Sequence, residues 1–167
     1  PSHLHLLQMD VSSESSIEAA ASSCPIALNH IVHNAAGIYL PGTSFDGTTR
    51  GPRDVAPKVT KDTLMRTYEI NSIAPLLIVQ HFLHKMNVRS SNLLPLLAFV
   101  SSKVGSVDDN GSGGAYAYAY RSSKSALNSI AKSLSSVDLA NEARVMLLHL
   151  GYVRTDMTEG KEGFIDA

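Results

Sequence analysis

Short apolar stretches alternate with longer amphipathic stretches along this chain. Strands buried on both faces of a parallel sheet are apolar throughout, and crossover helices connect them. The alternation therefore predicts one α/β domain over residues 1–167, with strands and helices in turn. The expected strands are 4–11, 27–33, 96–101 and 145–150, and the expected helices are 13–23, 60–86 and 116–139.

Local signals support the expected helices. Ser13 or Ser15 can cap the first helix, with Glu18 at capping-box distance from Ser15, and Thr60 can cap the second. Pro75 interrupts the second helix and predicts a kink or two helices there. In the third helix the apolar residues recur at one-face spacing, which predicts a packed face made by Ala126, Leu127, Ile130, Ala131, Leu134 and Val137.

Composition and charge narrow the classes of function. The chain is 44% apolar and 17% charged, which excludes a disordered chain, and its net charge of -1 gives no reason to expect nucleic acid as a partner. No apolar stretch approaches the length of a membrane span, and residues 1–5 do not resemble a secretory leader. Because Cys24 is the single cysteine, a reducing, cytoplasmic location is expected.

Two loop-like segments and two histidine pairs are candidate ligand sites. Residues 41–59 and 105–115 are rich in turn-forming residues and follow strands, at the sheet edge where ligands of α/β proteins bind. His30 and His33 lie in an expected strand, where three-residue spacing places side chains on opposite faces. His81 and His84 have no obvious third ligand nearby. No metal site is predicted.

Tyr120 and Lys124 form the sharpest candidate for chemistry. Residues four apart share one face of a helix, so the phenol and the ammonium can meet in one small site. A nearby cation favours the ionised phenol and lowers its pKa, which suits exchange of a proton between a carbonyl and an alcohol. The pair alone is weak evidence, because a Tyr–Lys pair on a helix is usually solvated. Tyr116 and Tyr118 have no Lys four residues on.

Two further motifs follow strands. Ser101 and Ser102 end the stretch 96–101, where a hydroxyl can stabilise charge on a substrate oxygen. Residues 34–37, Asn-Ala-Ala-Gly, follow the stretch 27–33, and their small side chains allow close approach of a ligand. Each motif alone would also fit an ordinary turn.

In their order along the chain these motifs resemble the short-chain dehydrogenase/reductase family. The order is an acidic residue after a strand (Asp10-Val11), Asn-Ala-Ala-Gly (34–37), a helical Asn (Asn71), Ser-Ser (101–102), Tyr-x-x-x-Lys (120–124) and Gly-x-Val-x-Thr (151–155). Residues 118–128 and the glycine-rich segment 105–115 are similar to the sniffer or C-signal-like carbonyl reductases. The resemblance implies a Rossmann-like three-layer parallel sheet with helices on both faces.

The resemblance also implies roles. Tyr120 would be the acid/base, Lys124 would lower its pKa and hold the nicotinamide ribose, Ser102 would orient the substrate carbonyl, and Asn71 would hold a relay water. The cofactor is implied to be NAD or, as a mild preference, NADP, and the substrate a small carbonyl or alcohol compound. The residues implied to contact the cofactor are Asp10, Val11, Asn34, Ala35, Ala36, Gly37, Tyr120, Lys124, Val153 and Thr155.

The sequence departs from the family pattern at both ends. It has no Thr-Gly-x-x-x-Gly-x-Gly turn, which cradles the pyrophosphate in the family, and it resembles the family from its third strand onward, without the last strand. Leu150 stands where the family usually has Pro. Without the family's first strand, the stretch 4–11 lacks a neighbouring strand for its backbone hydrogen bonds. We therefore expect residues 1–11 either to pair with the edge of strand 27–33 or to stay poorly ordered.

Two alternatives remain open from the sequence. One is a catalytically inactive remnant that acts, if at all, as an interaction module, with a possible homodimer formed through helices 60–86 and 116–139. The other is an α/β domain of unrelated function, which requires the ordered motifs to be coincidence.

Overall fold

The computed structural model describes residues 4–37, 59–86, 94–111 and 118–151. At its centre lies a parallel sheet of β1 (His30–His33), β2 (Leu96–Val100) and β3 (Arg144–Leu148), in the order β1-β2-β3. The register pairs His33 with Phe99 and Phe99 with Leu147. This parallel arrangement confirms the predicted α/β class.

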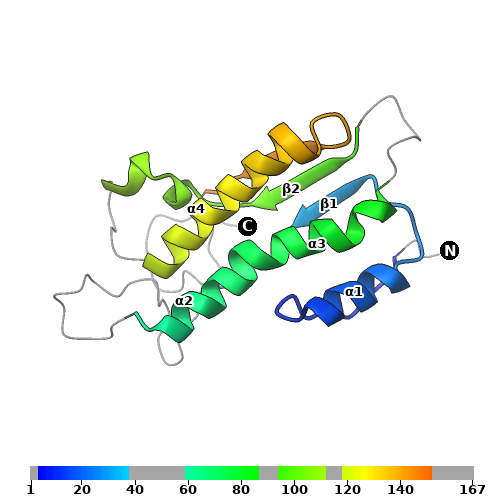
Figure 1. Ribbon diagram of the computed structural model, residues 1–167, viewed down its shortest axis with the longest axis horizontal. Coiled ribbons are helices and arrows are strands. Elements are labelled where there is room, and N and C mark those ends of the chain that lie inside the picture. The colour runs from blue at the N-terminus through cyan, green and yellow to red at the C-terminus, as the bar shows by residue number, and fades with distance from the viewer. Residues whose placement is uncertain (1–3, 38–58, 87–93, 112–117, 152–167) are drawn as a thin grey trace.

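One face of the sheet carries the core. Because side chains alternate between faces along a strand, Leu97 and Phe99 share a face, and both are buried. They pack in one cluster with Val79 and Leu127. Figure 1 shows α3 (Ala74–Phe82) and α4 (Tyr118–Ser133) lying across this sheet. On the opposite face Val32 and Met146 are 60% and 47% exposed.

The first helix, α1 (Glu14–Ser23), begins as the sequence predicts. The Ser13 side chain accepts a hydrogen bond from Ser16 N at 3.3 Å and caps the helix. Buried Ile17 belongs to a second cluster that includes Phe82 of α3. In Figure 1, α1 accordingly lies beside α3.

The predicted helix 60–86 is divided, as Pro75 indicated. Thr60 caps α2 (Lys61–Tyr68) by accepting a hydrogen bond from Thr63 N at 3.2 Å. A π-helical turn, η2 (Glu69–Ile73), follows, then α3 with Pro75 in its first turn, and a 3₁₀ turn, η3 (Leu83–Lys85), ends the segment. Proline lacks the N–H that would continue an α-helical ladder, and just before it the Ala74 N–H bonds Glu69 O in the π-helical pattern.

The last predicted helix consists of α4 and a π-helical turn, η6 (Leu134–Asp138). Its predicted packed face is confirmed at Leu127, Ala131 and Leu134, which are buried, but Val137 is 76% exposed. The π-helical turn explains this miss, since it breaks the 3.6-residue period that placed Val137 on the packed face. Tyr116 lies outside the described residues.

The prediction of a strand over residues 4–11 is wrong. Residues 4–10 belong to no strand of the described sheet, and Leu4, Leu6 and Leu7 are exposed. An extended segment needs a neighbouring strand for its backbone hydrogen bonds, and among the described strands β1 pairs with β2 alone. The expected pairing of residues 1–11 with the β1 edge is therefore not seen for residues 4–10.

The other predicted boundaries shift by a few residues. The stretch 27–33 contributes only four residues to β1, and Leu28 instead makes an isolated parallel bridge with Met86. Within the predicted loop 105–115, Asp108–Gly111 (η5) forms a 3₁₀ turn, and residues 41–58 lie outside the described residues.

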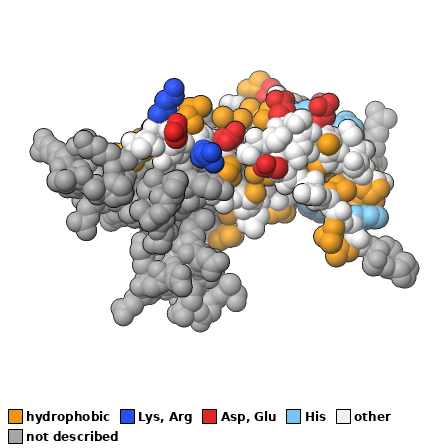
Figure 2. Space-filling view, turned by 90° about the horizontal axis from the view of Figure 1, so that it is seen from below, with side chains coloured by type: hydrophobic (Ala, Val, Ile, Leu, Met, Phe, Trp, Pro, Cys, Tyr) orange, Lys and Arg blue, Asp and Glu red, His pale blue; other side chains and the backbone are white. Residues whose placement is uncertain are grey.

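The described residues can be searched for a membrane span, and the face drawn in Figure 2 for a gathering of basic side chains. No helix in the described segments is long and apolar enough to cross a membrane. On the face shown in Figure 2, described acidic and basic side chains lie among apolar ones, and Lys and Arg do not gather into a patch.

Candidate active site

Ser102 lies where β2 ends. It leads into a 3₁₀ turn, η4 (Lys103–Gly105), and its hydroxyl accepts a hydrogen bond from Val104 N at 3.4 Å. The carboxyl end of a central parallel strand is where ligands of α/β proteins bind. Ser102 is partly exposed there, whereas Ser101 is buried.

Tyr120 and Lys124 lie one turn apart at the beginning of α4. The Lys124 Nζ atom lies 5.7 Å from the centre of the Tyr120 ring and donates a hydrogen bond to Val100 O at 2.9 Å. The Ser102 side chain lies near the Tyr120 phenol, where it acts as a hydrogen-bonding group that lowers the pKa of that phenol. The structure therefore brings three of the four predicted catalytic side chains together at the end of β2.

Burial controls the protonation of this pair. Burial raises the pKa of the Tyr120 phenol, and the hydrogen bond with Ser102 opposes this rise. Burial lowers the pKa of Lys124 to about 8, so the ammonium is mainly charged at neutral pH. The sequence predicted that Lys124 lowers the Tyr120 pKa; here desolvation of the phenol dominates and the net direction is upward.

Asn71, the fourth predicted residue, joins three elements from the π-helical turn η2. Its Oδ1 accepts a hydrogen bond from Gly37 N at 2.9 Å, and its Nδ2 donates to Gly37 O at 2.9 Å and to Ser123 Oγ at 3.1 Å. Ser123 Oγ in turn donates to Tyr120 O at 2.8 Å. The Asn71 side chain thus connects the Asn-Ala-Ala-Gly segment to α4, and its water-holding role stays a prediction.

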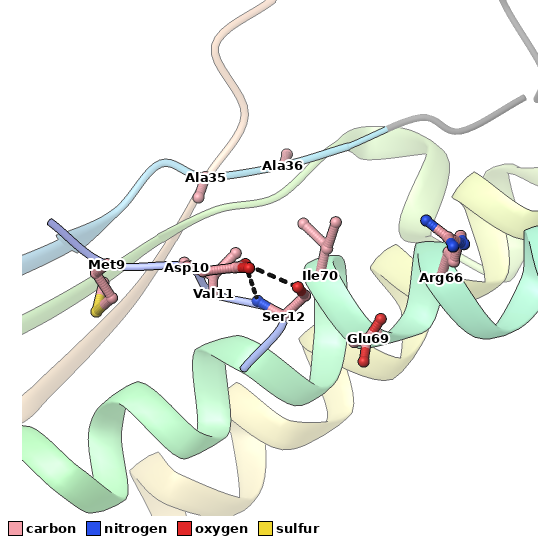
Figure 3. A pocket seen from close by; sticks show the side chains of 9 residues that line it. All are labelled: Met9, Asp10, Val11, Ser12, Ala35, Ala36, Arg66, Glu69 and Ile70. Atoms are coloured by element: carbon pink, nitrogen blue, oxygen red, sulfur yellow. Dashed lines mark hydrogen bonds between the residues drawn. The ribbon is translucent and has the colours of Figure 1, made fainter. Parts of the chain in front are cut away.

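A second group of predicted residues lines an open cavity of about 530 Å³. Figure 3 shows its lining residues: Met9, Asp10, Val11, Ser12, Ala35, Ala36, Arg66, Glu69 and Ile70. Four of these were predicted to contact a cofactor. Hydrogen bonds from the Ser12 side chain and backbone lower the pKa of Asp10, which keeps its carboxylate ionised.

The remaining predicted cofactor residues divide into two groups. Asn34 is exposed and does not line this cavity, while Gly37 is buried against Asn71. Val153 and Thr155 lie outside the described residues.

Sequence reasoning missed several residues around these sites. Ser123 is fully buried and connects Asn71 to Tyr120, although the sequence marked it only as an intervening residue of Tyr-x-x-x-Lys. Arg66 and Glu69 line the cavity from α2 and η2. Their three-residue spacing gives them one helical face, but only the fold shows that they line the same cavity as Asp10.

Nearly all of the chain matches one protein family. Residues 1–164 match the family model described as short chain dehydrogenase, and this chain belongs to that family. The residues of the ordered motifs are the ones that form the site. The family resemblance stated from the sequence is confirmed by this match.

Three known proteins are similar to the chain. The C-signal protein of Myxococcus xanthus is 42% identical over 95 residues, which cover 56% of this chain and 54% of that protein. The NADPH-bound carbonyl reductase from chicken fatty liver superposes with a TM-score of 0.74 at 27% identity over 98% of this chain. The carbonyl reductase Sniffer of D. melanogaster has a TM-score of 0.71 at 28% identity over 97% of this chain.

This chain spans about two thirds or less of each of these proteins. It covers 54% of C-signal and 64% of both carbonyl reductases. These matches support the sniffer and C-signal-like branch and the Rossmann-like fold.

Proposed function

We propose that this chain is an NAD(P)-dependent oxidoreductase that interconverts a carbonyl and an alcohol, with Tyr120 as the acid/base. The observation that carries the proposal is the placement of the Lys124 ammonium at the end of β2, 2.9 Å from Val100 O and 5.7 Å from the centre of the Tyr120 ring, with Ser102 beside them. Membership of the short chain dehydrogenase family supports the same reaction class.

The protonation states suit reduction of a carbonyl. A phenol with a raised pKa keeps its proton at neutral pH and can deliver it to the oxygen of a carbonyl that is being reduced. The Ser102 hydroxyl can donate a hydrogen bond to the same oxygen as negative charge develops. The Lys124 ammonium then stabilises the resulting tyrosinate. A bound nicotinamide cofactor would supply the hydride.

We assign the described cavity to the adenosine part of such a cofactor. Ala35 and Ala36 leave room for a flat ring on one side, and the Asp10 carboxylate offers an acceptor for an amino or hydroxyl group on the other. The similarity to an NADPH-bound carbonyl reductase supports NADP over NAD as a mild preference. Lys124 would hold the nicotinamide ribose. Asn71 would hold residues 34–37 and α4 in place through its hydrogen bonds to Gly37 and Ser123.

The decisive experiment replaces Tyr120 by Phe. We expect Tyr120→Phe to lower kcat by about 10²- to 10⁴-fold in a carbonyl reductase assay, because it removes the proton donor and leaves the ring. The matched control is Tyr118→Phe, since Tyr118 lies on the same helix, is exposed and has no Lys four residues on. The control variant should keep wild-type turnover.

A cofactor titration separates failure of chemistry from failure of binding. NADPH and NADH fluorescence is followed as each variant is added, with circular dichroism to verify folding. Tyr120→Phe should bind cofactor while losing turnover. Full turnover in Tyr120→Phe would refute the assignment of Tyr120.

A second candidate function is an interaction module that forms a homodimer through the helices in 60–86 and 118–138. The observation that favours it is the exposure of Met65, Ile73 and Val137 on these helices. A folded chain that binds neither cofactor but sediments as a dimer would favour this function over the enzyme.

A further inference from the structure

The turn that carries Ser102 is attached to α4 on both sides of that serine. On one side, Ser101 Oγ donates a hydrogen bond to Asn128 Oδ1 at 2.6 Å. On the other, Gly105 O accepts a hydrogen bond from Ser125 Oγ at 2.8 Å. Ser102 is therefore bracketed by two attachments to one helix.

Gly105 brings the turn into direct contact with α4. A Cβ atom at this position would lie 2.8 Å from the Lys124 backbone carbon, 2.9 Å from Lys124 Cβ and 3.0 Å from Asn128 Nδ2. Only glycine permits so close an approach without displacement. Movement of the turn toward the helix is thus blocked, and the two hydrogen bonds oppose movement away from it.

The turn is also closed on itself. Gly105 N donates to Ser102 O at 3.0 Å, and Ser106 N donates to Lys103 O at 2.9 Å. Displacing either attachment therefore moves the whole turn, with Ser102 in it, relative to Tyr120.

We propose that Ser125 and Asn128 are positioning residues that hold Ser102 in place beside Tyr120. They follow Lys124 by one and four residues, and they act on Ser102 through Gly105 and Ser101. The expected effect of these two residues on catalysis rests on the proposed function. The expected effect on the position of Ser102 relative to Tyr120 is independent of that function.

Small displacements of this kind have large effects. A shift of about 1 Å in a reacting group can lower a rate by about 100-fold. In the proposed reaction the Ser102 hydroxyl lowers the pKa of Tyr120 and donates a hydrogen bond to the substrate oxygen. Both roles depend on the position of the turn relative to α4.

The test compares two serines of the same helical segment. Ser125 Oγ and Ser136 Oγ each lie within hydrogen-bond distance of the carbonyl oxygen four residues earlier, at 3.1 Å and 2.6 Å. Only the Ser125 hydroxyl also reaches the turn, where its single proton is shared with the nearer Gly105 O at 2.8 Å. We expect Ser125→Ala to lower kcat roughly tenfold to a hundredfold, with the KM for cofactor unchanged. Ser136→Ala should match the wild type.

A second readout needs no turnover. Because the hydrogen bond with Ser102 lowers the Tyr120 pKa, loss of that bond should raise it. Titration of ¹³Cζ-labelled tyrosine by NMR, with the Tyr120 signal assigned from the Tyr120→Phe spectrum, should show an upward shift in Ser125→Ala and none in Ser136→Ala. This readout stays valid even where the proposed function fails.

Asn128→Ala tests the other attachment in the same way and replaces Ser125→Ala where that variant does not fold. An unchanged Tyr120 titration in folded Ser125→Ala and Asn128→Ala would overturn the proposal. Equal shifts in Ser125→Ala and Ser136→Ala would overturn it as well, since they would show a general effect of helix stability.

Discussion

His33, at the end of β1, is a buried histidine that the proposed reaction does not use. It is 6% exposed, its ring centre lies 6.4 Å from that of Phe99, and its Nε2 has no hydrogen-bond partner within the described residues. Burial, then the charge of Lys124, lower the His33 pKa to about 4, against the smaller opposing effect of a hydrogen bond with the Ala35 backbone. His33 is thus neutral at neutral pH.

This histidine should make folding sensitive to mild acid. Between pH 6.5 and about 4 the unfolded chain binds a proton at this position that the folded chain does not, so stability falls as pH falls through this range. The loss is on the order of 3 kcal/mol when complete. We expect His33→Gln to flatten this part of the stability curve, measured by urea unfolding at a series of pH values.

The matched control is His30→Gln, because His30 lies on the same strand with its side chain exposed. It should keep the acid dependence of the wild type. A His33→Gln curve that follows the wild type would show that the acid sensitivity arises elsewhere.

Residue roles were predictable where both partners lie on one element. The four-residue spacing of Tyr120 and Lys124 was enough to predict their contact, since a helix fixes it. The hydrogen bonds from Asn71 to Gly37 and Ser123 join residues 34 and 52 positions apart, and only the folded chain brings these together. The direction of the Tyr120 pKa shift was missed because it depends on burial, which spacing does not give.

At the scale of elements, the π-helical turn η2 is held to the end of β1 by Asn71. Asn71→Ala would leave both the N–H and the C=O of buried Gly37 without this partner. We expect a loss of about 2–3 kcal/mol in the free energy of unfolding, measured in urea, since each unsatisfied buried group costs about 1–3 kcal/mol.

Ser72→Ala provides the comparison, because Ser72 Oγ makes a single hydrogen bond, to Ser123 O at 2.8 Å, from the same turn. It should cost about 1 kcal/mol. Equal losses in the two variants would contradict the special role of the Asn71 amide.

Helix ends were predicted better than strands. The caps at Ser13 and Thr60 and the break near Pro75 depend on local chemistry, and all three are confirmed. Strand pairing depends on neighbours far along the chain. The apolar stretch 4–11 has strand-like composition, yet residues 4–10 pair with no described strand.

At the scale of the whole molecule, the order of the strands predicts a gradient of protection. β2 is bonded on both sides, β1 and β3 each on one side among the described strands, and residues 4–9 belong to none. In hydrogen exchange followed by mass spectrometry we expect the amides of β2 to exchange slowest, those of β1 and β3 faster, and those of residues 4–9 fastest.

The comparison between residues 4–9 and α1 sharpens this prediction. The two segments are adjacent in sequence, but α1 is capped by Ser13 and packs through Ile17 against α3, whereas Leu4, Leu6 and Leu7 are exposed. Protection should therefore rise steeply between residues 9 and 17. If residues 4–9 were instead as protected as β2, they would be paired with another strand in solution, and the β1 edge or a second copy of the chain would have to provide the partner.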